Sequence, residues 1–135
     1  MTHLGKVAQA RGDFVRAEAY YRRASELTGK IDPDGLGFAD TLERLGSLSW
    51  RRGEFITAEG YHRHALAIRE KVQPGGLSTA LSLRNLGTVA TSRGDLSKAW
   101  EYHSQALKLR EKLAPGSEDH ADSLLRVVGV LRSQG

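Results

Sequence analysis

The stretch RGDFVRAEAYYRRA, residues 11–24, decides the fold because it returns as RGEFITAEGYHRHA at residues 52–65 and as RGDLSKAWEYHSQA at residues 93–106. The three copies keep their small and apolar positions and change their polar ones. Packing fixes the volume of a buried side chain and leaves solvated positions free to vary. The repetition therefore indicates a conserved shape.

The repeat has a constant length of 41 residues. Four sets of identical residues follow this period: Gly12, Gly53 and Gly94; Pro33, Pro74 and Pro115; Ala17, Ala58 and Ala99; Tyr20, Tyr61 and Tyr102. A fixed period of this size is typical of a stacked repeat protein.

Composition limits the functional classes. The chain has 135 residues, a net charge of +4, 39% hydrophobic residues, a mean hydropathy of −0.44 and no cysteine. The absence of cysteine excludes disulfides and thiolate metal sites. No apolar run reaches the roughly 18 residues of a membrane span, and the N-terminal residues lack the pattern of a signal peptide. We therefore expect a soluble, cytoplasmic protein.

Each period contains two helical patterns. The first, helix A, buries a stripe that in the second period comprises Ala39, Leu42, Leu45, Gly46 and Ser49. Glycine then favours the left-handed conformation that ends a helix. The second, helix B, has its stripe at Phe55, Ala58, Tyr61, His62, Ala65 and Ile68 and runs to about Val72. Such a short connection predicts an antiparallel helix pair.

These residues resemble the tetratricopeptide repeat (TPR) family. The resemblance is carried by Leu45 and Gly46, by GEF at residues 53–55 and by the Ala-Glu-x-Tyr-x-x-x-Ala pattern of residues 58–65. The wording ALAIREKVQPG and ALKLREKLAPG is similar to the kinesin-light-chain-like branch. It is also similar to bacterial TPR arrays attached to CHAT or NTPase domains, although no residue here encodes such a domain.

The resemblance implies an all-α TPR-type α-solenoid, a right-handed superhelix of three antiparallel helix pairs plus a final helix. The expected divisions are residues 1–35 for a first repeat with a shortened helix A, 36–76 and 77–117 for complete repeats, and 118–135 for the helix A of an incomplete fourth. Ser117 is the expected N-cap of that final helix. Val128 takes the place of Gly46 and Gly87, so the final helix A is expected to pack differently.

In this family the concave surface is lined mainly by helix A and binds an extended or helical peptide. Beside the core stripe, this face carries polar residues that vary between repeats. Asn85 matches the asparagine that holds the ligand backbone in relatives. Basic residues outnumber acidic ones, which predicts an acidic peptide. The predicted groove comprises Lys6, Asp40, Glu43, Arg44, Ser47, Trp50, Arg51, Leu81, Arg84, Asn85, Thr88, Asp122 and Arg126.

The positions equivalent to Trp50 and Trp100 carry other residue types in the other repeats. Trp50 is expected either to anchor a ligand in the groove or to pack against a neighbouring helix. For Trp100, on helix B, we expect local packing rather than an outer contact patch.

The sequence indicates a non-enzymatic protein-interaction scaffold without cofactors. His62 and His103 occupy the position of Tyr21 and are expected to fill a space between helices rather than to bind metal. No nucleophile elbow or phosphate-binding loop is present. The alternatives are an RNA-binding helical repeat, favoured only by the pI of about 9.6, and a structural spacer that self-associates through the ends of the array. If the chain is such a spacer, the predicted groove residues simply belong to solvated helix faces.

Overall fold

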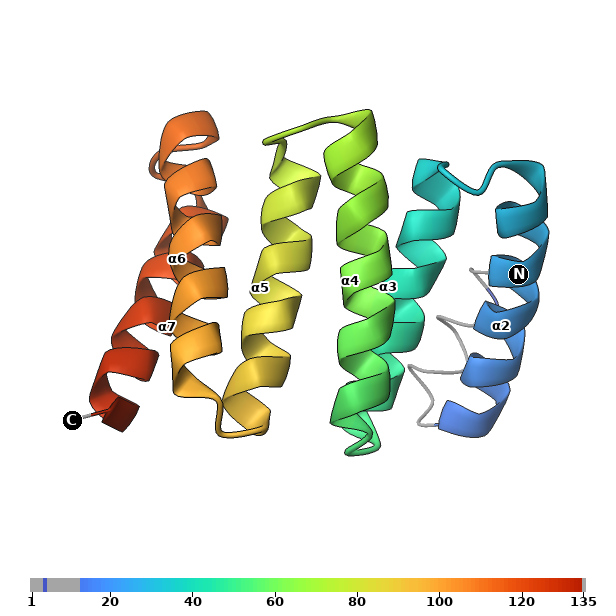
Figure 1. The fold of residues 1–135 in the computed structure, drawn as a ribbon, viewed down its shortest axis with the longest axis horizontal. Coiled ribbons are helices and arrows are strands. Elements are labelled where there is room, and N and C mark those ends of the chain that lie inside the picture. Colours follow the sequence, from blue (N-terminus) through green and yellow to red (C-terminus); the bar gives the residue numbers. More distant parts are fainter. Residues whose placement is uncertain (1–3, 5–12, 135) are drawn as a thin grey trace. The chain divides into compact units, whose positions relative to one another are not determined.

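The computed structural model describes residue 4 and residues 13–134, and in that part of the chain every regular element is a helix. The predicted all-α TPR-type fold is confirmed. Six helices follow residue 13, in the order α2 (Phe14–Ile31), α3 (Leu36–Arg51), α4 (Phe55–Val72), α5 (Leu77–Ser92), α6 (Leu96–Leu113) and α7 (Glu118–Gln134) (Figure 1). The shortened first helix A and the groove residue Lys6 lie outside the described residues.

The helices form two compact units, residues 1–72 and 73–135. In unit 1, α3 packs against both α2 and α4, and in unit 2, α6 packs against both α5 and α7 (Figure 1). By the 41-residue period, α3, α5 and α7 are A helices, and α2, α4 and α6 are B helices. The repeat boundaries remain a prediction, and the helix bounds are compatible with them.

Glycine ends the A helices as predicted. Gly53 and Gly94 have φ values of 79° and 78°. The Gly53 amide donates to the Trp50 carbonyl, and the Glu54 amide donates to the Ser49 carbonyl at 2.8 Å. These two hydrogen bonds satisfy carbonyl groups that have no partner within the helix, and the turn leads the chain into helix B.

Side chains cap the starts of several helices. Asp13 and Asp95 accept from backbone amides in the first turns of α2 and α6. The Ser117 hydroxyl accepts from the His120 amide at 3.1 Å, which confirms Ser117 as the cap of α7. Each cap satisfies an amide that has no partner within its helix.

Most residues of the predicted core stripes are buried, whereas Phe55 and Tyr61 are half-buried. In unit 1, one apolar cluster joins Ala17 and Tyr21 of α2 to Leu45 and Leu48 of α3, and a second joins α3 to α4 through Ala39, Leu42, Ala65 and Ile68. In unit 2, Ala90, Ala99 and Val130 join α5, α6 and α7. Small side chains at these contacts allow the helices to approach closely.

A buried histidine fills the space beside the glycine of each complete helix pair. A Cβ atom on Gly46 would lie 2.6 Å from Cε1 of His62, and one on Gly87 would lie 2.5 Å from Cε1 of His103. The prediction that both histidines fill an interhelical space is confirmed. Glycine is required at these positions because any side chain would displace the imidazole ring.

Candidate functional site

The A helices carry the predicted groove residues, and in unit 1 these belong to α3. Asp40 and Arg51 are exposed, whereas Arg44, Ser47 and Trp50 are half-buried. The Arg51 guanidinium lies 5.9 Å from the centre of the Phe14 ring, a cation–π contact. Trp50 is half-buried, and its role as a ligand anchor remains a prediction.

Glu43 does not line an exposed surface, so its assignment to a solvent-facing groove is wrong. The residue is only 6% exposed. One carboxylate oxygen of Glu43 lies 3.3 Å from Nδ1 of His62 and 3.8 Å from the Arg69 guanidinium. A buried carboxylate requires such partners, because losing water without them is costly. Glu43 is therefore part of the packing between α3 and α4.

Arg44 also has a structural partner. It hydrogen-bonds the Tyr21 hydroxyl of α2, beside the apolar cluster that joins the two helices. Burial raises the pKa of Tyr21, and the nearby Arg44 opposes this rise without cancelling it. Replacing Arg44 would therefore disturb the contact between α2 and α3 as well as remove a charge.

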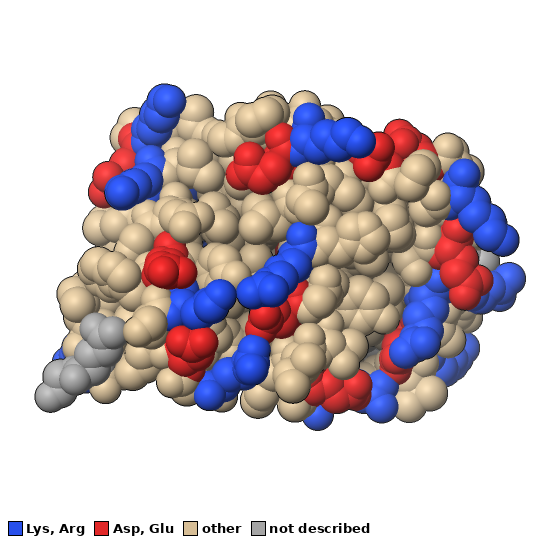
Figure 2. Space-filling model, viewed as in Figure 1, with Lys and Arg blue, Asp and Glu red and all other residues tan. Residues whose placement is uncertain are grey.

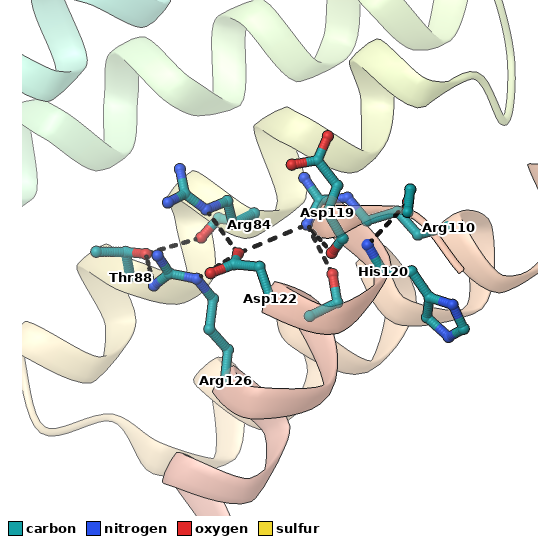
Figure 3. Close-up of polar contacts among 9 residues, drawn as sticks. Arg84, Thr88, Arg110, Asp119, His120, Asp122 and Arg126 are labelled. Carbon is teal, nitrogen blue, oxygen red and sulfur yellow. Dashed lines mark hydrogen bonds and ion pairs between the residues drawn. The ribbon is translucent and has the colours of Figure 1, made fainter. Parts of the chain in front are cut away.

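In unit 2 the predicted residues come together. Leu81 is exposed, and the remaining five, from α5 and α7, are half-buried: Arg84, Asn85, Thr88, Asp122 and Arg126. Four of these form a connected set with Arg110 of α6. We call Arg84, Thr88, Arg110, Asp122 and Arg126 the arginine cluster (Figure 3).

Asp122 is the centre of the arginine cluster. One of its carboxylate oxygens lies 2.9 Å from Nε of Arg126, 3.3 Å from Nε of Arg84 and 3.9 Å from Nη1 of Arg110. Arg126 also donates to the Thr88 hydroxyl at 3.2 Å. The cluster thereby links side chains 38 residues apart in the sequence (Figure 3).

Arg110 is buried and is held by α7. Its Nη1 donates to the Ser123 hydroxyl at 2.6 Å and to the Asp119 carbonyl at 3.3 Å. Burial lowers the pKa of Arg110, and the charges of Arg84 and Arg126 act in the same direction against Asp119 and Asp122. The positive charge of Arg110 is therefore less favourable here than in water, even beside a carboxylate.

The arginines of the cluster also shift the pKa values of Asp122 and His103. Burial alone would raise the pKa of Asp122, but Arg126, Arg84 and Arg110 outweigh it and hold the pKa below its ordinary value. The pKa of His103 is lowered to about 4, first by burial and then by Arg126 and Arg84. Three guanidinium groups around one carboxylate thus leave the cluster positive.

Sequence reasoning missed the buried arginines of the B helices. Arg69 in unit 1 donates to Asp40 at 2.9 Å, and Arg110 holds α7 in unit 2. Their signal was present, because both stand one period apart in the similar stretches AIREK and KLREK. A charged residue that recurs within a conserved apolar pattern indicates a buried, partnered group.

The described residues contain no group of three or more His, Asp or Glu side chains placed to hold a metal ion. None of the described helices has the length and apolar character needed to cross a membrane. On the face that Figure 2 draws, Lys and Arg side chains are interspersed with Asp and Glu and form no continuous field of one sign.

The chain belongs to the tetratricopeptide repeat family. The family's sequence profile matches residues 1–71 and again residues 37–112, which together cover most of the chain. No curated protein matches significantly.

Several solved structures share the fold. BtubC (BKLC) from P. vanneervenii is 21% identical with a TM-score of 0.92, over 99% of this chain and 55% of that one. A kinesin-light-chain-type protein with nearly identical TPR-like repeats from Podospora anserina is 16% identical with a TM-score of 0.80, over 98% and 64%. The N-terminal domain of stress-induced protein-1 (STI-1) from C. elegans is 15% identical with a TM-score of 0.68, over 93% and 90%.

These matches support the kinesin-light-chain-like resemblance at the level of the fold. The chain spans about half to two thirds of the first two proteins. Tetratricopeptide repeats generally mediate protein–protein interactions, so this class of function follows from the family.

Proposed function

We propose that this chain is a non-enzymatic interaction module that binds an acidic peptide segment on the helix A faces of unit 2, at the arginine cluster. The observation that carries the proposal is the convergence of Arg84, Arg110 and Arg126 on the single carboxylate of Asp122. The cluster keeps an excess of positive charge, which an acidic side chain would reduce.

The geometry of the cluster suits a carboxylate ligand. Arg84 and Arg126 are half-buried, and each approaches Asp122 through Nε. In Figure 3 the far end of the Arg84 guanidinium points away from Asp122. Charge-assisted hydrogen bonds from a partly buried guanidinium are stronger than those at a fully solvated one. Neighbouring Asn85 and Leu81 on α5 would contact the peptide beside this charged position.

Unit 1 presents a weaker site for an anion. On α3, Glu43 is buried against His62 and Arg69, and Arg44 is engaged by Tyr21. Arg51 and Asp40 are exposed and have opposite charge. We therefore expect the arginine cluster of unit 2, rather than the α3 face, to attract the acidic peptide.

The test compares two variants of equal charge. Arg84→Gln/Arg126→Gln removes two positive charges from the cluster, and Lys108→Gln/Lys112→Gln removes two from exposed positions of α6 in the same unit. The probes are fluorescein-labelled short peptides rich in Asp and Glu, and the same peptides with Asn and Gln. Anisotropy measures binding, and circular dichroism checks that each variant remains helical.

We expect acidic peptides to bind the wild type and the lysine variant, and to bind the arginine variant at least about tenfold more weakly, equivalent to about 1.4 kcal/mol. Binding should also weaken with added salt. Equal affinity of both variants would place recognition elsewhere, and equal binding of the neutral peptides would remove the acidic specificity. Nucleic acid is expected to bind weakly, because the 20 Lys and Arg residues are accompanied by 16 Asp and Glu residues and the net charge is only +4.

A further inference from the structure

Arg84 keeps hydrogen-bond donors that the arginine cluster does not use. Its guanidinium group contacts Asp122 through Nε at 3.3 Å, and among the described residues it has no other hydrogen-bond or ion-pair partner. The terminal Nη atoms point away from Asp122 in Figure 3. Because the Arg84 side chain is 33% exposed, a ligand can reach these donors.

Arg126 stands beside Arg84 at the same carboxylate. The Nε atoms of both arginines lie within 3.3 Å of one oxygen of Asp122, and Arg126 also donates to the Thr88 hydroxyl of α5. Arg126 is therefore held on the side of α7 that faces α5, and the site lies between two helices of the described chain. Arginines held in place before binding reduce the ordering cost when a ligand arrives.

The surroundings of these two arginines carry an excess of positive charge. Arg84, Arg110 and Arg126 approach the single carboxylate of Asp122, and the exposed carboxylate of Asp119 also acts on Arg110. One or two positive charges therefore remain in excess, according to whether Asp119 is counted. Burial and the two arginines hold the pKa of His103 at about 4, so this histidine is neutral at pH 7 and adds no charge.

A phosphate monoester matches this excess better than a carboxylate does. At pH 7 it carries about −1.5 to −2 charges, whereas a carboxylate carries a single one. It also presents three strong acceptor oxygens, and a guanidinium group donates to phosphate through two parallel N–H bonds. The unused Nη atoms of Arg84 can form such a pair.

The surface beside Arg84 favours a peptide as the carrier of the phosphate. Leu77 and Leu81 precede Arg84 at intervals of four and three residues, which places the three on one side of α5. Both leucines are exposed and can pack against apolar side chains of a peptide. A nucleic acid is instead held through several successive phosphates. The preceding repeat has Glu43 at the position of Arg84, so the site is not repeated along the chain.

We propose that the arginine cluster binds a phosphorylated side chain of a partner peptide, with the Nη atoms of Arg84 donating to the phosphate and Arg126 adding positive charge beside it. This inference rests on the proposed function and narrows its ligand from acidic peptides in general to phosphopeptides. Leu77 and Leu81 contact apolar residues of the same peptide. Inorganic phosphate and nucleic acid share the phosphate chemistry, so the experiment includes both.

The experiment compares three fluorescein-labelled peptides that differ at one position, which is phosphoserine, aspartate or serine. Anisotropy should show the phosphoserine peptide binding the wild type at least about tenfold more tightly than the aspartate peptide. Arg84→Gln should abolish this preference, and Arg84→Lys should reduce it, because lysine keeps the charge but not the paired donors. Lys108→Gln is the control of equal charge, since Lys108 is an exposed residue of α6. Full preference in Arg84→Lys would contradict the paired donation.

The pH dependence identifies the group that binds. The second pKa of a phosphate monoester is about 6, so the phosphoserine peptide should bind about fourfold more weakly at pH 5.5 than at pH 7.5 if the dianion is the bound form. An aspartate stays ionised across this range. Any titration within the protein affects both peptides, so the ratio of the two affinities reports on the phosphate alone. An unchanged ratio would overturn the proposal.

The remaining outcomes separate this proposal from the proposed function. Equal affinities for the phosphoserine and aspartate peptides, both lost in Arg84→Gln/Arg126→Gln, would overturn the phosphate ligand and leave the acidic-peptide function standing. Absence of binding by either peptide would overturn both. Displacement of the phosphoserine peptide by an equal concentration of inorganic phosphate, or tighter binding of an oligonucleotide of equal charge, would overturn the peptide as the carrier.

Discussion

The second and third repeats place a histidine in the same position and surround it with opposite charge. In unit 1, His62 lies 3.3 Å from the buried carboxylate of Glu43. One period later, Arg84 stands in the place of Glu43, and the charges of Arg126 and Arg84 lower the pKa of His103 against the opposing charge of Asp122. The comparison teaches that the repeat conserves the volume between its helices, whereas the charge around that volume is free to specialise.

The largest expected effect is a loss of stability, and it tests the glycine–histidine contact that both repeats share. Gly87→Ala should destabilise the protein by about 3 kcal/mol, because the added Cβ would overlap the His103 ring. Gly46→Ala should act similarly through His62. Urea unfolding followed by circular dichroism measures both effects.

Gly60→Ala is the matched control, since a Cβ atom there meets nothing within 4 Å among the described residues. It should raise stability by about 0.5 to 1 kcal/mol through helix propensity. In Gly87→Ala/His103→Ala, part of the loss should be recovered. If the second change instead adds its full cost, the ring is not what excludes a side chain at Gly87.

The next prediction uses pH to test the environment of His103. His103 has a pKa of about 4 in the folded protein and about 6.5 when unfolded. Below pH 6.5 the unfolded chain therefore binds the additional proton, so stability falls as pH decreases toward 4. This group alone should cost about 2 kcal/mol between pH 7.5 and pH 5. Unfolding at both pH values measures the loss.

The control for this prediction is His103→Gln, which removes the titrating group. The difference in stability between the two pH values should be smaller in this variant by about the same 2 kcal/mol. An unchanged difference would show that His103 is not protonated on unfolding.

The buried arginines of the B helices provide a smaller test. Ser123→Ala should cost about 1.5 kcal/mol, because Arg110 is buried and would lose a hydrogen bond of 2.6 Å. Asp40→Asn should cost no more than about 0.5 kcal/mol, since Asp40 is 62% exposed and Arg69 retains Glu43. Thermal unfolding compares the two, and equal losses would mean that burial does not distinguish them.

The smallest expected effect is a change in the pKa of His103, which tests the charge around this histidine directly. In Arg84→Gln, the pKa of His103 should rise, because one of the two nearby positive charges is removed. It should stay below its ordinary value, since burial is the larger cause. The titration of the imidazole Cε1–H signal by NMR measures the shift, and a downward movement would contradict the proposed field.

Most of the fold could be predicted from the sequence. The 41-residue period, the glycines after helix A and the apolar stripes gave helix bounds that the structure confirms, as Gly53, Ser117 and Val72 show. These features depend on neighbours within one or two helical turns, and such local chemistry is written directly in the order of residues.

The candidate site could be predicted only in part. The periodicity correctly brought Arg84 and Asp122 to the A helices, but it placed Glu43 on an exposed face. Glu43 lies at the edge of the core stripe, where burial depends on what the facing helix offers. His62 and Arg69 of α4 cover it and provide partners.

The sequence by itself determined the class of fold, the helix ends and the positions that pack. Only the tertiary structure decided which charges are buried, and that Arg84, Arg110 and Arg126 share the carboxylate of Asp122. The physical reason is distance along the chain. Helix formation and capping act between residues a few positions apart. The ion pairs of a charged side chain instead form with residues on other helices, which come together only when the chain has folded.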